Sequence, residues 1–327
     1  MVDEVGTVEL KSGEQMEIVR VAPPEPDWRD RVLPFLAHKI EPWQWQMHVA
    51  FDQGLPGATQ YYYEGVLDGE IVGNIMTVES MDRPIGILGH VFTPEEQRRK
   101  GICTHLMRAV TEDFRDRDGR AMFLHTGYDS APYHIYESWG FEGYRDTGTM
   151  AWILEPDFRA NHFAPRPVKP RETHWGDWPA LEALAEVDEG WDVRSAYLDQ
   201  HGFGGFEGQY LQIRRGVIEG DVRDFKVLSS EDGAVMGYAL LAPWEAFPEE
   251  PLVLDTFVHP NFTGDAVALV GSVDLPDGEP VFALSDSESP GRADALEAVG
   301  FAHEATLADA VTDDAGQKRD LLIYARV

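Results

Sequence analysis

The chain has 327 residues, of which 43% are hydrophobic, and 58 Asp and Glu against 27 Lys and Arg give it a formal net charge of -31. This length favours two domains, and the plentiful aromatic residues exclude a disordered acidic chain. No basic face is visible, which excludes nucleic acid as a partner. A single cysteine, Cys103, and scattered histidines predict neither a disulfide framework nor a metal site.

The acidity also bears on where the protein works. Only six of the cations are lysine. We interpret this composition as typical of a protein from a salt-rich cytoplasm, where mobile ions screen the repulsion between its carboxylates. An ordinary acidic protein is the alternative. No apolar stretch is long enough to span a membrane, and the acidic N-terminus lacks the apolar core of a secretion signal. We therefore expect a cytoplasmic protein with no membrane partner.

The first half alternates between strand and helix patterns. Short helices are predicted over 27–52, interrupted by prolines, and a longer one over 100–118 ends at a glycine. A further helix is predicted over 130–139. Strands are predicted over 6–10, 15–21, 60–78 (two strands around a tight Asp68-Gly69 turn), 85–93, 121–126, 141–146 and 149–154. Four prolines and no periodicity mark 156–171 as a linker.

The second half repeats landmarks of the first. "AVMGYALL" resembles "EIVGNIMTV", "VLDTFVHPNF" resembles "ILGHVFTPEE", and "SESPGRADALEAVGF" resembles "YDSAPYHIYESWGF". These matches keep the same order at nearly one spacing. They predict a tandem duplication of one α/β unit, with domains over 1–155 and 172–327.

Three consecutive cations and a glycine stand where the predicted strand over 85–93 turns into the long helix. The stretch Arg98-Arg99-Lys100-Gly101-Ile102-Cys103, with Tyr136 four residues before Gly140-Phe141, resembles the motifs of the GNAT superfamily of acyl-CoA-dependent N-acyltransferases. Cys103 replaces the family's second small residue, and Asp129 stands where the family usually has Asn. The resemblance covers residues 15–155 and implies two GNAT domains, each a mixed, mostly antiparallel sheet flanked by helices, with the second degenerate.

The chemistry of this turn suits an anion. A helix start has unpaired N–H groups and a positive dipole end, and a glycine admits a pyrophosphate close to the backbone. A charged surface helix start is the alternative. The resemblance implies acetyl-CoA as co-substrate, with pantetheine along the backbone of one strand end and pyrophosphate at the turn. The implied cofactor-binding residues are His90, Val91, Phe92, Arg98, Arg99, Lys100, Gly101, Ile102, Cys103, Thr104 and Asp129.

The resemblance implies direct attack of an amine on the thioester, with Tyr136 as general acid. For the base we prefer His125 over His90, and Glu79 or a chain of waters remains open. Each histidine, like Tyr136, could instead be a core residue. A covalent intermediate on Cys103 is rejected, because this residue occupies the phosphate turn and no partner histidine is evident.

Four aromatic residues are candidates for the acceptor pocket, with a core role as the alternative: Trp43, Trp45, Tyr61 and Tyr63. The second half has no cationic turn, and Leu296 takes the place of Tyr136, so we expect it to bind no CoA. The leading hypothesis is an N-acetyltransferase acting on a small-molecule or peptide amine, with a homodimer possible. A non-catalytic acyl-CoA sensor and a purely structural protein are the alternatives.

Overall fold

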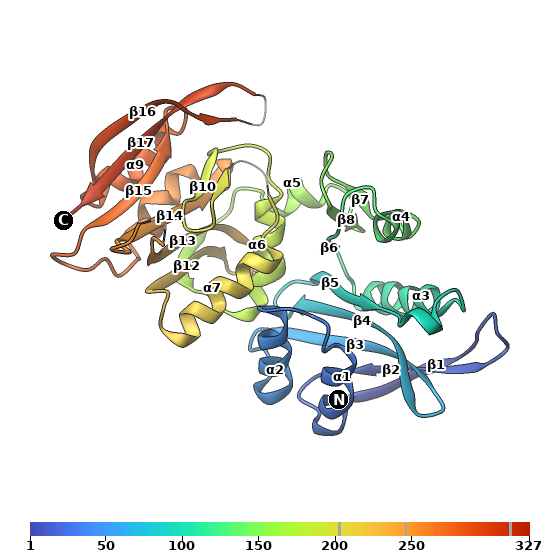
Figure 1. The fold of residues 1–327 in the computed structure, drawn as a ribbon. Helices are drawn as coiled ribbons and strands as arrows, with labels where there is room; N and C mark the ends of the chain where they lie inside the picture. Colours follow the sequence, from blue (N-terminus) through green and yellow to red (C-terminus); the bar gives the residue numbers. More distant parts are fainter. Residues whose placement is uncertain (202–203, 246, 314–315) are drawn as a thin grey trace. The chain divides into compact units, whose positions relative to one another are not determined.

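A computed structural model describes residues 1–201, 204–245, 247–313 and 316–327, and these form two compact units (Figure 1). Unit 1 comprises Met1–Phe158 and His174–Pro179, and unit 2 comprises Arg159–Thr173 and Ala180–Val327. Each unit is built on its own sheet with flanking helices. This arrangement confirms the predicted α/β class with two mostly antiparallel sheets.

The sheet of unit 1 has eight strands in the order β1-β2-β3-β4-β5-β6-β8-β7. Only β5 and β6 run parallel, and every other neighbouring pair is antiparallel. The strands are β1 (Val2–Glu9), β2 (Gln15–Val21), β3 (Ala58–Leu67), β4 (Glu70–Ser80), β5 (Ile85–Phe92), β6 (Ala121–His125), β7 (Glu142–Gly143) and β8 (Thr149–Ile153).

Helices cover both faces of this sheet, with α1 and α2 on one face and α3 on the other (Figure 1). The first helical region consists of two short helices: Pro42 directly precedes α2, whereas Pro34, which was also expected to interrupt a helix, lies inside α1, one residue before its end. The helices of unit 1 are α1 (Pro26–Phe35), α2 (Trp43–Gln53), η1 (Glu95–Gln97), α3 (Ile102–Asp116), α4 (Ala131–Glu137) and η2 (Trp175–Asp177).

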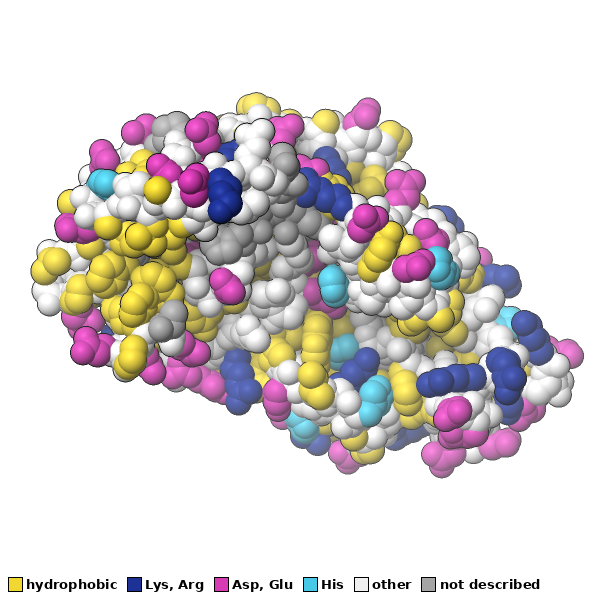
Figure 2. Space-filling view, turned by 45° about the horizontal axis from the view of Figure 1, so that its top comes forward, with side chains coloured by type: hydrophobic (Ala, Val, Ile, Leu, Met, Phe, Trp, Pro, Cys, Tyr) yellow, Lys and Arg dark blue, Asp and Glu magenta, His cyan; other side chains and the backbone are white. Residues whose placement is uncertain are grey.

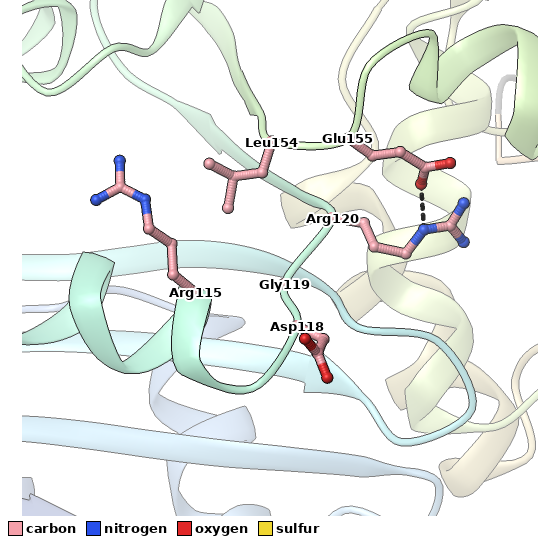
Figure 3. A pocket seen from close by; sticks show the side chains of 6 residues that line it. All are labelled: Arg115, Asp118, Gly119, Arg120, Leu154 and Glu155. Carbon is pink, nitrogen blue, oxygen red and sulfur yellow. Dashed lines mark hydrogen bonds and ion pairs between the residues drawn. The ribbon is translucent and has the colours of Figure 1, made fainter.

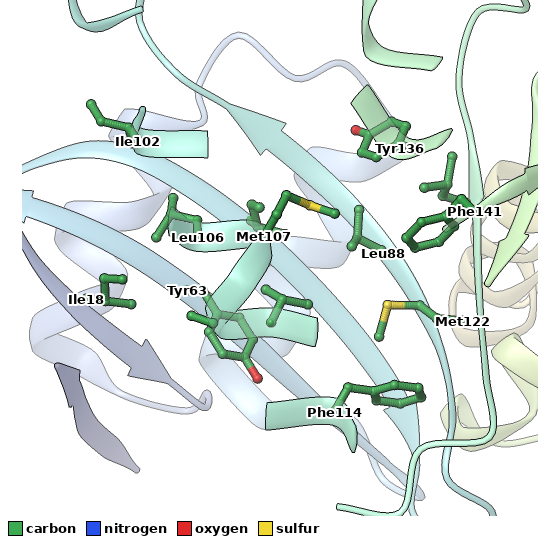
Figure 4. Close-up of a cluster of buried hydrophobic side chains, with 14 of the residues drawn as sticks. Ile18, Tyr63, Leu88, Ile102, Leu106, Met107, Phe114, Met122, Tyr136 and Phe141 are labelled. Carbon is green, nitrogen blue, oxygen red and sulfur yellow. The ribbon is translucent and has the colours of Figure 1, made fainter. Parts of the chain in front are cut away.

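The core of unit 1 lies between the sheet and the apolar side of α3 (Figure 4). The buried positions of α3 recur at helical spacing, with Ile102, Leu106 and Val110 among them. The start of α3 comes very close to β4 at Gly73, where a Cβ would lie 2.4 Å from a methyl carbon of Ile102. A glycine at this position therefore sets how closely the helix start approaches the sheet.

Unit 2 has a seven-stranded sheet in the order β16-β17-β15-β14-β13-β12-β9, and a separate pair, β10 and β11. Its single parallel pair is β14 and β15. The strands are β9 (Val168–Glu172), β10 (Val193–Ser195), β11 (Gln200–His201), β12 (Asp224–Ser230), β13 (Val235–Pro243), β14 (Leu252–Val258), β15 (Val281–Asp286), β16 (Ala302–Thr312) and β17 (Lys318–Arg326).

The remaining helical segments are α5 (Phe158–His162), α6 (Trp178–Ala185), α7 (Glu207–Glu219), η3 (Pro260–Asp265), α8 (Ala266–Val270) and α9 (Pro290–Ala298). From β9 onward, unit 2 follows the strand order that unit 1 has from β2 onward, including the place of the parallel pair. A tandem duplication predicts this pattern, and the duplication itself stays a prediction.

The region where the first half of the chain passes into the second differs from the sequence expectations in two ways. The stretch 156–171, predicted to be a linker, contains α5 and the beginning of β9. The six residues His174–Pro179 pack with unit 1, although the predicted second domain begins at residue 172. Among the described residues, no helix has the length and apolar character needed to cross a bilayer.

Candidate cofactor site

An irregularity in the sheet of unit 1 shapes the site. Asn74 on β4 pairs with Phe92 on β5, whereas Met76 pairs with Gly89, so β5 carries an extra residue between these two pairs. His90 lies in this bulge with a φ of 50°, and the side-chain amide of Asn74 donates a hydrogen bond to its carbonyl oxygen at 2.7 Å. A bulge bends the strand and leaves backbone groups unpaired, which sequence periodicity does not reveal.

Beside the bulge, β5 separates from its parallel neighbour. Pairing between β5 and β6 covers only Ile85–Ile87 with Ala121–Phe123. His90 and His125 lie beyond the last of these pairs, one on each strand. The two histidines proposed as bases therefore flank the point at which the sheet opens.

The helix α3 begins next to this opening. Gly101 precedes its first residue with a φ of 94°, a conformation that favours glycine, and no side chain caps the helix start. A Cβ on Gly101 would have no atom closer than 3.8 Å, so the backbone at the helix start is not crowded on this side. An uncapped start of a fifteen-residue helix is suited to an anion.

The cations of the turn have different roles. Lys100 forms an ion pair with Glu14 at 3.0 Å, and the Nε of Arg98 donates a hydrogen bond to the carbonyl of Thr93 at 3.1 Å. Arg99 is exposed, and it forms no ion pair within the part of the chain that the structure describes. Lys and Arg side chains gather at the right-hand end of Figure 2, over the region of unit 1 that carries β1, β2 and α3. Arg99 is therefore available to a phosphate, and Arg98 keeps the two terminal nitrogens of its guanidinium for the same purpose.

A cavity of about 520 Å³, which we call the α3 cavity, lies at this helix start. Its volume is in the range of small-molecule sites. The residues that line it are Lys11, Val91, Phe92, Thr93, Gln97, Arg98, Arg99, Gly101, Ile102, Cys103, Thr104, Ala131, Pro132 and Ile135. Eight of the eleven predicted cofactor-binding residues are among them. The other three, His90, Lys100 and Asp129, are not.

Lys11 is a lining residue that the sequence reading missed. It belongs to the turn between β1 and β2, and its backbone N–H donates to the carbonyl of Lys100 at 3.0 Å. The sequence did contain a signal for Lys11: lysine is scarce in this chain, and this turn holds one of its six lysines. Lys11 joins Arg98 and Arg99 as a cation in the lining of the α3 cavity.

The start of α4 also lines the α3 cavity, through Ala131, Pro132 and Ile135. The cap of this helix is Ser130, whose hydroxyl accepts a hydrogen bond from the N–H of Tyr133 at 3.3 Å. Asp129 is exposed with a φ of 54°, and its carboxylate lies 3.1 Å from the Nε2 of His134. The side chain at the position of the family's Asn therefore contacts its own helix.

His90 is buried, with 6% of its surface exposed, and neither ring nitrogen has a hydrogen-bond partner among the described residues. Burial, with smaller contributions from Lys39 and His38, lowers the pKa of His90 to about 3. The imidazole is therefore neutral at ordinary pH and is a weak base. Its ring meets the edge of Trp43, with centroids 5.3 Å apart.

His125 ends β6 with an exposed side chain whose Nδ1 lies 3.3 Å from the hydroxyl of Thr149. Partial burial of the ring lowers the pKa of His125 from its usual value. Tyr136 is 8% exposed and packs in the core beside Phe141, with ring centroids 5.9 Å apart (Figure 4). Tyr136 is not among the residues that line the α3 cavity.

The third candidate base, Glu79, lies elsewhere. It pairs in register with Gly86, near the opposite end of β5 from His90. Its carboxylate accepts a hydrogen bond from Arg117 at 2.6 Å, and Arg117 also lies over the ring of Tyr61. Glu79 is thus bound in a charge cluster at the far end of α3, away from the opening of the sheet.

The four aromatic candidates for the acceptor pocket fall on different faces of the sheet. Tyr63 packs in the α3 core and donates to Asp113, with Tyr61 beside it. Trp43 and Trp45 belong to α2, on the other face. Only Trp43 of the four has a ring contact with His90.

Cys103 lines the α3 cavity as a partly buried free thiol. Burial raises the pKa of this thiol. Because the thiolate is the reactive form, a raised pKa makes Cys103 a poor nucleophile at neutral pH. This agrees with the rejection of a covalent acyl-cysteine.

A second cavity, of about 440 Å³, lies at the other end of α3 (Figure 3). Arg115, Leu154 and an ion pair between Arg120 and Glu155 line it. In this ion pair, the charges of Arg120 and Glu155 neutralise each other. The length of α3 separates this cavity from the α3 cavity. It has no part in the site described above.

A mixed sheet that opens at a bulge, with an uncapped glycine-led helix start beside the opening, defines an α/β domain suited to a long anionic cofactor. Residues 26–141 match the family model described as "Acetyltransferase (GNAT) family", so this part of the chain is a GNAT domain. No curated protein was found to match the chain.

Solved structures with a similar arrangement include three acetyltransferases. A ribosomal-protein-alanine N-acetyltransferase from Brucella melitensis is 19% identical, with 48% of this chain and 98% of that chain covered and a TM-score of 0.39. A putative acetyltransferase from Salmonella typhimurium, with its cofactor acetyl-CoA, is 18% identical, with coverages of 49% and 94% and a TM-score of 0.40. A spermidine N-acetyltransferase from Vibrio cholerae, in complex with CoA and spermine, is 14% identical, with coverages of 49% and 94% and a TM-score of 0.37.

Proposed function

We propose that unit 1 transfers an acyl group, most simply acetyl, from acyl-CoA to a primary amine. The observation that carries this proposal is the uncapped start of α3, which opens onto a cavity of about 520 Å³ beside the bulge in β5. The match of residues 26–141 to the acetyltransferase family supports the same activity.

The residues of the α3 cavity fit the parts of coenzyme A. Backbone N–H groups from Arg99 to Thr104 would hold the pyrophosphate, and Arg99 and Lys11 would add positive charge. The backbone of Val91 and Phe92 would pair with the pantetheine arm, because in the part of the chain that the structure describes β5 pairs with β6 only as far as Ile87.

The reaction needs a base and an acid on either side of the thioester. The amine nitrogen attacks the carbonyl carbon, the C–S bond breaks, the base takes the ammonium proton, and the departing thiolate takes a proton from an acid. His125 is the better base of the two histidines, since burial holds the pKa of His90 near 3. We assign the acid role to Tyr136, as the family resemblance implies.

A second candidate function is an acyl-CoA-binding protein without catalysis. It is favoured by one observation: Tyr136 packs in the core and does not line the α3 cavity. In that case CoA binds, no thiol is released in the presence of amines, and Tyr136→Phe changes nothing. A thiol-release assay over a panel of small amines and peptides separates the two functions.

Binding is tested by thermal unfolding in molar salt with and without millimolar acetyl-CoA. We expect acetyl-CoA to raise the Tm of the wild type, and Gly101→Glu to abolish the rise, since a carboxylate would then stand at the helix start. Gly69→Glu is the matched control: Gly69 also has a positive φ, of 86°, with open space around it, in the turn between β3 and β4. An unshifted wild-type Tm would refute the proposal.

A further inference from the structure

Six residues from beyond the predicted linker pack into unit 1. This segment, His174–Pro179, which we call the strap, contains the short helix η2. A capping box closes η2: the Nδ1 of His174 accepts from the N–H of Gly176 at 3.1 Å, and the N–H of His174 donates to Asp177 at 2.8 Å. The strap is therefore an ordered element with internal hydrogen bonds.

The strap interlocks with the loop between α2 and β3 at two glycines. A Cβ on Gly57 would lie 2.4 Å from the Nδ1 of His174, and a Cβ on Gly176 would lie 2.1 Å from the carbonyl oxygen of Gly57. Side chains larger than hydrogen do not fit at either place. This fit fixes the position of the strap against the α2 side of unit 1.

Two tryptophans of the strap extend the aromatic residues of α2. The ring of Trp175 lies 5.8 Å from Trp45, and that of Trp178 lies 6.0 Å from Trp43. Both strap indoles are almost fully buried, with 2% and 0% exposed, whereas Trp43 is half-buried. Trp178 thus packs against Trp43, and part of the Trp43 side chain remains accessible.

Trp43 in turn contacts the ring of His90 in the bulge, with an interplanar angle of 77°. Since neither nitrogen of His90 has a hydrogen-bond partner among the described residues, packing alone sets the orientation of this ring. The chain of contacts from Trp178 through Trp43 to His90 reaches the opening of the sheet from the face that α1 and α2 cover.

We propose that the strap positions the acceptor side of the active site, with Trp178 as a positioning residue and Trp43 as the wall that the acceptor contacts. This inference rests on the proposed function. It assigns a role in catalysis by unit 1 to residues from the second half of the sequence. The half-buried indole of Trp43 favours an acceptor with an apolar or cationic body next to its reacting amine.

Gly57→Ala in the full chain tests the proposal without altering a tryptophan. The new methyl group displaces the strap at His174, so we expect the acceptor KM to rise roughly tenfold or more, as misplaced contacts commonly cause. The Kd of acetyl-CoA should stay within about twofold. Gly69→Ala is the matched control, because its φ of 86° equals that of Gly57, 85°, within one degree and no atom lies within 4 Å of its Cβ.

Trp178→Ala and Trp178→Phe give a second reading. We expect the alanine variant to raise the acceptor KM, and the phenylalanine variant to have an acceptor KM much closer to that of the wild type. Both variants should still bind acetyl-CoA. If Gly57→Ala and Trp178→Ala fold and leave the acceptor KM unchanged, the strap proposal is wrong. If the wild type binds no acetyl-CoA, the proposed function is wrong, and the strap proposal falls with it.

Discussion

At the scale of single residues, burial separates two histidines that look alike in sequence. His90 and His125 both end the regular part of a strand beside the opening of the sheet. The ring of His90 is enclosed, and its pKa is lowered to about 3, whereas His125 is exposed to solvent and its pKa is lowered by partial burial alone. The sequence pattern predicts that both residues lie at strand ends. The packing around each ring determines how far its pKa is lowered.

This difference predicts the pH dependence of catalysis. A base acts in its neutral form, so kcat should be level at neutral pH and fall as the pH drops through the lowered pKa of His125, below its usual value of about 6.5. His125→Ala should lower kcat by roughly 100-fold or more and remove this acidic limb. The profile is measured at saturating amine and acetyl-CoA.

The matched variant is His90→Ala, which should leave the acidic limb in place even if it alters the acceptor KM. A wild-type kcat that stays level down to the pH at which the protein unfolds would assign the base to His90 or to water. An unchanged limb in His125→Ala would exclude His125 directly.

At the scale of elements, the contact of α3 with the sheet depends on a glycine in β4. A methyl group on Gly73 would press on Ile102, the first residue of α3, and on Leu106 one turn later. We expect Gly73→Ala to lower the free energy of unfolding by about 1–3 kcal/mol, as overpacking of a core does. Because the helix start would shift, the Kd of acetyl-CoA should rise by roughly tenfold.

Gly237→Ala in β13 is the matched control in unit 2. Its Cβ would meet a methyl carbon of Val258 at 2.6 Å and the carbonyl oxygen of Phe257 at 2.8 Å. This variant should also lose stability in chemical denaturation, but its affinity for acetyl-CoA should match the wild type. Equal losses of affinity in both variants would contradict a specific role for the start of α3.

The elements near the site differ in how far their sequence predicts them. The helix after Gly101 is readable, because an amphipathic pattern and a glycine at its start are local signals. The bulge at His90 is not, since it depends on the register with β4. Lys11 reaches the α3 cavity, and the strap reaches Trp43, through contacts between distant segments, which no local pattern contains. The contacts that decide the site are therefore those between elements.

At the scale of the whole molecule, the two sheets share a strand order from β2 and from β9 onward, but they differ in the details that suit a cofactor. In unit 2 the pairing of β13 with β14 has no bulge. The helix after β14, α8, has five residues, and Asp265 precedes it in place of a glycine. Leu296, at the position of Tyr136, is fully buried. We therefore propose that unit 2 binds no CoA.

This proposal predicts one acetyl-CoA per chain. Calorimetric titration of the full chain, in molar salt to screen its charge of -31, should give a single site. Gly101→Glu should remove all of the binding heat, because a carboxylate then stands at the start of α3, while Gly69→Glu should keep one site. Two sites in the wild type, or one remaining in Gly101→Glu, would mean that unit 2 binds the cofactor without a bulge or a glycine-led helix, and that these features are not what selects it.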